Sequence, residues 1–202
     1  MVSLLDHAAA LATSLTEADL VPGPASGLIP PDFKPTTHLA VTFGDKSAEV
    51  GTFFRAGECK QNPHILFGPE LEAPTDSSYT LILTDPDAPT PDDPKFAFWR
   101  HYVVSGLRPG ASEEEYETSV KGSGGKVLTT YLGPGPKDDS KPHRYLFLLY
   151  REPPNLAIEK ADVGGEEFVD RRSFKPKEFA EKHGLQLVGV NWMTCAGDGW
   201  KE

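Results

Sequence analysis

The sequence has little cysteine and no excess of positive charge. Cys59 and Cys195 are its only 2 cysteines, so no disulfide framework is expected and both thiols are predicted to be reduced and buried. That prediction favours a cytoplasmic location. Lys and Arg total 20 against 30 Asp and Glu, a net charge of -10, which argues against a broad basic surface for nucleic acid or anionic lipid.

Long hydrophobic runs are also missing. No stretch approaches the ~20 apolar residues that a membrane-spanning helix needs, so we predict no transmembrane segment. The apolar residues 1–20 differ from a signal peptide because Asp6 and His7 interrupt them and no basic region precedes them. The chain also has no G-x-S-x-G motif, which argues against a serine nucleophile, and its "GSGG" run lacks the strand–helix context of a phosphate loop. We expect no cofactor.

The N-terminal segment is predicted to form an amphipathic helix followed by an extended connector. Apolar residues recur at helical spacing from Leu4 to Leu15, Ser3 and Asp6 fit a variant capping box, and Pro22 with Gly23 ends the pattern. We therefore divide the chain into residues 1–37, the helix and connector, and residues 38–202, a β domain.

The rest of the chain is predicted to be mostly β. Short segments rich in β-branched and aromatic residues are separated by turn formers; they are residues 38–43, 48–54, 79–84, 100–107, 126–133, 143–151 and 185–193. Such a series favours an antiparallel sandwich or barrel. A second helix is predicted near the C-terminus, with Ser173 as a cap, Pro176 in its first turn and Gly184 after its end. Residues 112–126 fit either a frayed helix or a loop, and a solvated loop without chemistry is favoured.

Two carboxylates and several prolines follow one predicted strand in "TDPDAP". Asp85 and Asp87 come directly after the strand, and Pro86 and Pro89 restrict the turn that follows. The Ala88–Pro89 bond is a candidate cis peptide. Taken alone, this segment favours a proline-rich turn that has no chemistry.

Aromatic and histidine side chains begin the next predicted strand, "WRHYVV". Alternation along a strand places Trp99 and His101 on one face and Arg100 and Tyr102 on the other. A later loop, "GPGPKDDSKP", leads into a strand on which His143 and Tyr145 share a face. The two regions could converge at one end of a sandwich as a site of two His, two Asp and aromatic residues.

These motifs resemble the phosphatidylethanolamine-binding proteins, also called Raf kinase inhibitor proteins. "DPDAP", "WRHYVV" and "GPGP…HRYLFLLY" match the family's two signature regions in order, and "FKPKEFAEKHGLQLVGVNW" resembles its closing helix and strand. The resemblance extends from about residue 38 to about residue 193. The N-terminal helix and "GLIPPDFKPTTHLAVTF" are similar to the fungal branch, which includes inhibitors of the serine carboxypeptidase Y.

The resemblance implies the family's antiparallel β-sandwich and a small anion-binding pocket. Its lining would be Asp85, Asp87, Pro89, Trp99, His101, Gly133, Pro134, His143 and Tyr145. Imidazoles and loop N–H groups would donate to a phosphate, a phospholipid headgroup or a carboxylate, and the carboxylates would hold the histidine tautomers. Phe96 stands where the family often has Tyr, and the loop of residues 133–143 is longer than the shortest animal versions, which leaves the ligand open.

The expected function is therefore that of an anion-binding protein, with inhibition of a serine carboxypeptidase through the N-terminal helix as one form of it. In that form, deleting residues 1–20 would weaken inhibition and leave the β domain folded. An alternative is an enzyme of fungal secondary metabolism that acts on anionic or anhydride-like intermediates, with His101, His143 or Asp85 as general acid or base. A scaffold that binds kinases is a further alternative, which rests only on analogy at the level of the fold. A metal on these Asp and His side chains lacks the local spacing that would support it.

Overall fold

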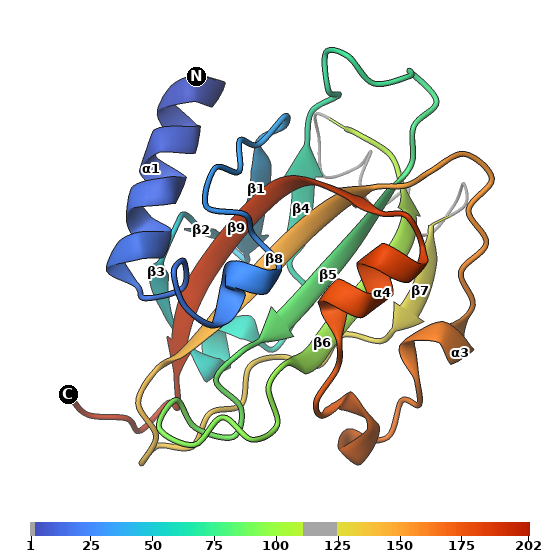
Figure 1. Ribbon diagram of the computed structural model, residues 1–202. Coiled ribbons are helices and arrows are strands. Elements are labelled where there is room, and N and C mark those ends of the chain that lie inside the picture. The colour runs from blue at the N-terminus through green and yellow to red at the C-terminus, as the bar shows by residue number, and fades with distance from the viewer. Residues whose placement is uncertain (1–2, 111–124) are drawn as a thin grey trace.

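The computed structural model describes residues 3–110 and 125–202, which form two β-sheets flanked by helices (Figure 1). The larger sheet has 6 strands in the order β3-β9-β8-β5-β6-β7, and the smaller has 3 in the order β2-β1-β4. All pairs are antiparallel except β3 with β9. The strands are β1 Leu39–Phe43, β2 Lys46–Ala48, β3 Thr52–Arg55, β4 His64–Phe67, β5 Tyr79–Asp85, β6 Trp99–Leu107, β7 Lys126–Thr129, β8 His143–Arg151 and β9 Gln186–Ala196.

The predicted mostly β architecture with N- and C-terminal helices is confirmed. One predicted strand, residues 48–54, is instead split between β2 and β3. The break lies at Gly51, whose φ of +100° suits glycine and whose missing Cβ leaves room for Trp192. Strand β4 was not predicted, because its four residues are too short to show a clear alternation.

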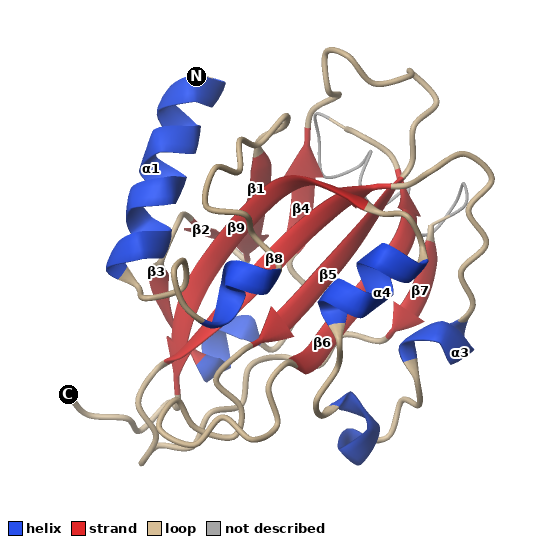
Figure 2. Cartoon of the chain, viewed as in Figure 1, coloured by secondary structure: helices blue, strands red, loops and turns tan. Residues whose placement is uncertain are grey.

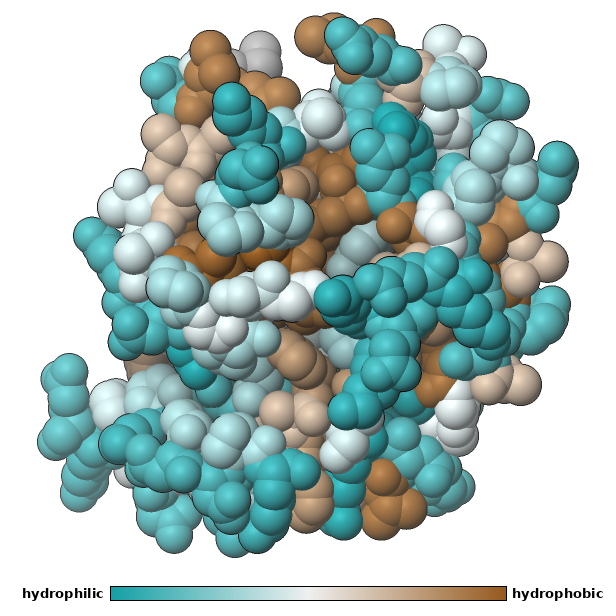
Figure 3. Space-filling view, viewed as in Figure 1, coloured by the Kyte–Doolittle hydropathy of each residue, from teal (hydrophilic) through white to brown (hydrophobic). Residues whose placement is uncertain are grey.

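Two apolar clusters cover the two faces of the larger sheet. The first fills the space between the sheets and includes Phe43, Phe67 and Phe147. The second lies on the opposite face under α1 (Leu4–Glu17) and α4 (Pro176–Lys182); Figure 2 shows α1 to the left of the sheet and α4 in front of it. Apolar surface is visible in the hollow between these two helices (Figure 3). The remaining helices are η1 Pro24–Gly27, η2 Ala56–Cys59, α3 Lys160–Val163 and η3 Phe168–Arg171.

Helix α1 begins as predicted and joins the second cluster. Ser3 is its N-cap, and the Ser3 hydroxyl accepts from the Asp6 N–H at 3.1 Å. The helix ends at Glu17, before the predicted stop. Leu11 and Leu15 pack in the same cluster as strand residues of β8 and β9, so residues 1–37 share a core with residues 38–202. The division into two segments stays a prediction.

The C-terminal helix differs from the prediction at its start. Pro176 begins α4, and Gly184, at φ +62°, follows its end as predicted. Ser173 is not its cap: the N-cap position belongs to Lys175, and no side chain bonds there. Ser173 itself has a φ of +53°. The predicted loop of residues 112–126 lies mostly outside the described residues, although Lys126 already begins β7.

None of the helices in the described ranges is both long and apolar enough to cross a bilayer.

Candidate functional site

Asp85 and His143 meet where β5 ends beside the start of β8 (Figure 1). Asp85 Oδ2 lies 2.9 Å from His143 Nδ1, and its Oδ1 accepts from the Asp87 N–H at 2.6 Å. His143 Nε2 lies 3.1 Å from the Ser140 hydroxyl. Asp85 is 2 % exposed and His143 3 %. The imidazole of His143 is therefore fixed at both nitrogens in a nearly dry environment.

His101 has one nitrogen engaged and one free. Its Nδ1 lies 2.6 Å from the Leu132 carbonyl oxygen, so Nδ1 carries the proton and donates. Its Nε2 is buried and has no hydrogen-bond partner among the described residues. Burial lowers the pKa of His101 below its ordinary value, and the Asp85 carboxylate opposes that effect. Unliganded His101 is thus mainly neutral near pH 7.

Aromatic rings enclose the two imidazoles. The Tyr145 ring stacks on His143 with 6.3 Å between centroids, which confirms that these two share a face, and meets His101 edge-on at 5.2 Å. The Trp99 ring lies 6.4 Å from His101, and its Nε1 is also buried without a partner among the described residues. The Trp99 ring also contacts the Phe168 ring, with 4.6 Å between the ring centroids. Two nitrogens without a partner in the described part of the chain thus belong to neighbouring rings of one cluster.

The prediction that Arg100 and Tyr102 share a face is wrong. The Arg100 guanidinium lies over the Phe174 ring on the helix-covered side of the sheet, whereas Tyr102 belongs to the core between the sheets. The pairing of β5 with β6 shifts between Leu83 and Thr84, where the register has a bulge. A bulge adds one residue to one strand and so breaks the alternation on which the prediction depended.

Asp87 is bonded to Arg144. Its Oδ2 accepts from the Arg144 backbone N–H at 2.7 Å and from Nε at 2.9 Å, and its Oδ1 accepts from Nη2 at 2.6 Å. The hydrogen bond to Asp87 raises the pKa of Arg144. Arg144 Nη1 also donates to the Ala18 carbonyl at 2.8 Å, just after α1. The "DPDAP" corner is therefore tied to the N-terminal helix, and its Ala88–Pro89 bond is cis as predicted.

The glycine–proline loop reaches the cluster through the Leu132 carbonyl. Gly133 lies against η2, where an added Cβ would come within 2.5 Å of the Cys59 carbonyl oxygen. The Tyr131 hydroxyl donates to the same oxygen at 2.6 Å. Glycine is therefore required at this close approach. Pro134 is buried and Pro89 half-buried; with Gly133 they stay predicted ligand-binding residues.

Sequence reasoning missed three residues that shape the cluster: Ser140, Arg144 and Arg171. Ser140 bonds to His143, and Arg171 Nη1 donates to the His101 carbonyl oxygen at 3.2 Å. The only sequence signal for Ser140 was its position three residues before His143, and neither arginine had one. Their roles depend on contacts between distant segments.

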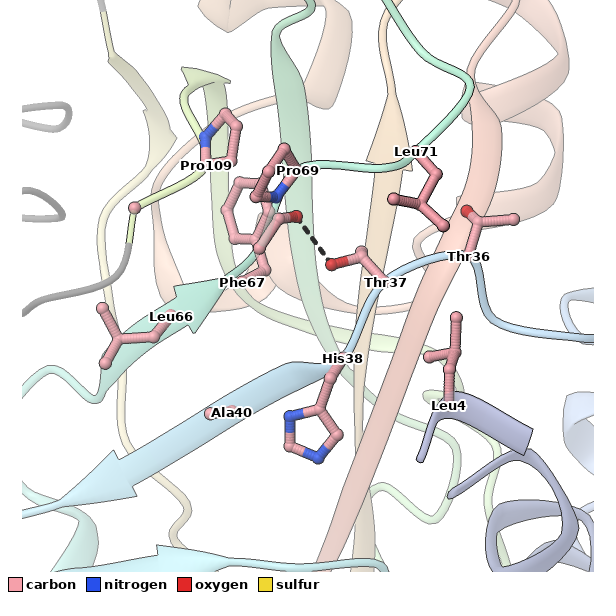
Figure 4. Close-up of a pocket in the computed structure, with 12 residues that line it drawn as sticks. Leu4, Thr36, Thr37, His38, Ala40, Leu66, Phe67, Pro69, Leu71 and Pro109 are labelled. Carbon is pink, nitrogen blue, oxygen red and sulfur yellow. Dashed lines mark hydrogen bonds between the residues drawn. The ribbon is translucent and has the colours of Figure 1, made fainter. Parts of the chain in front are cut away.

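The side chains of the cluster are buried, and a cavity of about 570 Å³ lies elsewhere, between the start of α1 and strands β1 and β4 (Figure 4). Leu4, His38 and Leu71 are among its lining residues, and the Thr37 hydroxyl donates to the Gly68 carbonyl at 2.7 Å beside it. None of the predicted site residues lines it. The cavity is thus separate from the histidine cluster.

A model of the family described as phosphatidylethanolamine-binding protein matches residues 30–192. The chain belongs to this family. A carboxypeptidase Y inhibitor, solved in complex with its cognate proteinase, is similar in structure, with a TM-score of 0.75, 23% identity and coverage of 95% of this chain and 97% of the inhibitor. The phosphatidylethanolamine-binding protein of Plasmodium vivax gives a TM-score of 0.68 at 21% identity, covering 93% and 97%. Its counterpart from Plasmodium falciparum gives 0.65 at 21%, covering 91% and 95%.

At these identities, the similarity to solved structures shows the fold of this phosphatidylethanolamine-binding protein family member and not its ligand. The ligand has to be inferred from the residues of the site. The family match covers β5, β6 and β8, which carry the strand residues of the predicted site. It starts after α1, so the N-terminal helix lies outside the segment that defines the family here.

Proposed function

We propose that this protein binds a small anion at the cluster of Asp85, His101, His143 and Trp99. The observation that carries the proposal is the pair of unused buried nitrogens, His101 Nε2 and Trp99 Nε1, in a cluster whose other polar atoms are bonded. Buried polar atoms without partners are uncommon in folded proteins and call for an explanation. An anion accepting from both nitrogens would supply the missing partner.

The chemistry of binding follows from the two histidines. His101 Nε2 donates to an anion only when the ring is protonated, because Nδ1 already donates to the Leu132 carbonyl. Asp85 orients His143 and favours positive charge nearby. A phosphate, a phosphorylated headgroup and a carboxylate share the acceptor oxygens that such a site recognises. Binding is therefore expected to take up a proton on His101.

Sulfate affinity is expected to increase as the pH falls from about 8 to about 5, by up to about tenfold per pH unit for one proton taken up. The pKa of His101 is lowered in the free protein and would be raised in the complex, so affinity rises as pH falls between those two values and then levels off. Isothermal titration calorimetry with sulfate measures this, because sulfate does not titrate in that range and the change belongs to the protein. Inorganic phosphate, O-phosphoethanolamine and acetate as further arms distinguish the ligand sources.

His101→Gln should abolish both the affinity and its pH dependence. His38→Gln is the matched control, since His38 is exposed and lies outside the cluster, and it should bind sulfate as the wild type does. Unaltered, pH-dependent sulfate binding by His101→Gln would contradict the proposal.

A serine carboxypeptidase is the protein partner that we propose. The likeness to a carboxypeptidase Y inhibitor over 95% of this chain supports it. Leu5 on α1 is 80% exposed, so its side chain is accessible to a partner that binds this helix. We expect the wild type to inhibit carboxypeptidase Y and Leu5→Glu to inhibit at least about tenfold more weakly, because a charge replaces an apolar contact.

Inhibition is measured by hydrolysis of a peptide substrate, and unchanged thermal unfolding of Leu5→Glu checks that the fold is intact. Val169→Glu, at a residue 59% exposed on η3, is the control for adding a negative charge to an apolar surface position away from α1. Equal inhibition by the wild type and Leu5→Glu would remove α1 from the interface.

A further inference from the structure

Two buried arginines flank the His101 segment. Arg171 is 5% exposed and Arg100 1%. Arg171 ends η3, the short helical turn drawn below α4 and β6 in Figure 2. The two guanidinium groups lie near enough that the charge of Arg171 contributes to lowering the pKa of Arg100, after the larger effect of burial. Two positive charges are thus concentrated beside one end of β6.

Neutral oxygens receive the hydrogen bonds of both arginines. Arg171 donates to the His101 carbonyl at 3.2 Å, to the Thr130 carbonyl at 2.8 Å, to the Thr130 hydroxyl at 3.0 Å and to the Glu166 carbonyl at 3.4 Å. Arg100 donates to the Thr129 hydroxyl at 2.8 Å and to the carbonyl oxygens of Val163, Gly165 and Asp170. Within residues 3–110 and 125–202, neither arginine forms an ion pair.

A buried guanidinium without a carboxylate is unusual in a chain with a net charge of -10. Burial lowers the pKa of Arg171, and the charge of Glu166 only partly opposes this. The Glu166 carboxylate accepts from the Thr130 N–H at 3.2 Å and lies 3.6 Å from Lys160 Nζ, so its interactions are shared with other groups. Carbonyl dipoles satisfy the hydrogen-bonding capacity of Arg171 and leave its charge unneutralised. An anion at the neighbouring cluster would complement that charge.

We propose that Arg171 is a positioning residue of the anion site: it holds the His101 backbone through the carbonyl oxygen and supplies positive potential that attracts the anion. This inference rests on the proposed function. The charged and titratable groups that face His101 are Asp85 from β5, His143 and Tyr145 from β8, and Arg171 from η3. Asp85 favours the protonated ring, whereas Arg171 and His143 disfavour it. Burial is the main cause of the lowered pKa of His101, and the charge of Arg171 adds to it.

The test compares Arg171→Gln, which removes the charge, with Arg171→Lys, which keeps it. The pKa of His101 is followed through its ring resonances by NMR without ligand, and sulfate affinity by calorimetry across pH. In Arg171→Gln we expect the pKa of His101 to rise and the affinity at low pH to fall on the order of tenfold. Arg171→Lys should restore the wild-type pKa. A merely structural role would weaken binding without moving the pKa.

Arg172→Gln is the matched control, because Arg172 is the next residue and carries the same charge. Its guanidinium lies over the Phe96 ring at 4.3 Å rather than on the His101 backbone, so the pKa of His101 should stay near the wild-type value. If Arg171→Gln fails to fold, Glu166→Gln tests the same charge balance in the opposite direction. Loss of that carboxylate, whose side chain is 38% exposed, should lower the pKa of His101 and strengthen sulfate binding at low pH.

Different results would contradict the role of Arg171 and the proposed function. The same pKa of His101 in wild type, Arg171→Gln and Glu166→Gln would overturn the role of Arg171, whatever the sulfate affinity. A wild type that binds none of the tested anions would overturn the proposed function, while the NMR comparison would still report whether Arg171 sets the charge state of His101.

Discussion

Asp87→Asn is expected to lower the free energy of unfolding by about 3 kcal/mol. Asp87 is 1% exposed, and its two carboxylate oxygens accept three hydrogen bonds from Arg144. An asparagine offers one acceptor oxygen and leaves the Arg144 side chain, only 20% exposed, without a counter-charge. Urea unfolding followed by fluorescence measures the change, because this chain has 3 tryptophans.

Asp92→Asn is the control for loss of an ion pair at the surface. Asp92 lies 2.6 Å from Lys141, but both side chains are at least 67% exposed, so the cost should stay within about 0.5 kcal/mol. The sequence resemblance implied a different role for Asp87, as a ligand-binding residue. An Asp87→Asn protein with wild-type stability and no sulfate binding would favour that role over the structural one.

Asp87 illustrates which parts of the site the sequence could predict. Its position after a strand and next to prolines was evident from "TDPDAP", and the cis bond at Ala88–Pro89 followed from the same turn chemistry. Its partner Arg144 lies 57 positions away. That contact depends on the register between β5 and β8, which a single sequence does not specify when both strands are apolar on both faces.

The histidines show the same division between local and long-range information. Alternation correctly placed His143 and Tyr145 on one face, since β8 is regular over that stretch. On β6 the alternation failed at Arg100 because of the bulge opposite Thr84. The charge environment of His101 depends on Arg171, 70 positions away on η3, and no local pattern indicated it.

The fold was more predictable than the site, because strand existence depends on local composition. Seven predicted segments correspond to strands, and both predicted helices exist. The short strand β4 and the parallel pairing of β3 with β9 were not predicted, since each is defined by its partner rather than by its own sequence. The role of α1 in the core also became clear only when its neighbours on β8 and β9 were known.

Deletion of residues 1–20 is expected to unfold the protein or to leave it only marginally stable. Leu11, Leu15 and Leu20 are between 0% and 3% exposed, and burial of each leucine side chain contributes about 1.5–3 kcal/mol. Their combined loss is comparable to the whole stability of a typical domain, about 5–15 kcal/mol. The deletion also removes the Ala18 and Asp19 carbonyl groups to which Arg144 donates. The sequence-based expectation that the β domain stays folded without this segment therefore changes.

Single substitutions on α1 also test whether this helix stabilises the fold. Leu15→Ala should cost about 2–5 kcal/mol, as large-to-small changes in a packed core do, whereas Leu5→Ala, at a residue 80% exposed, should change stability by less than about 0.5 kcal/mol. Urea unfolding of the two variants and of the truncated chain provides the comparison. A truncated chain that unfolds cooperatively at the wild-type midpoint would show that α1 packs on the sheet without stabilising it. If the truncated chain is instead unstable, loss of carboxypeptidase inhibition on truncation says nothing about contact, and only exposed positions such as Leu5 can locate the interface.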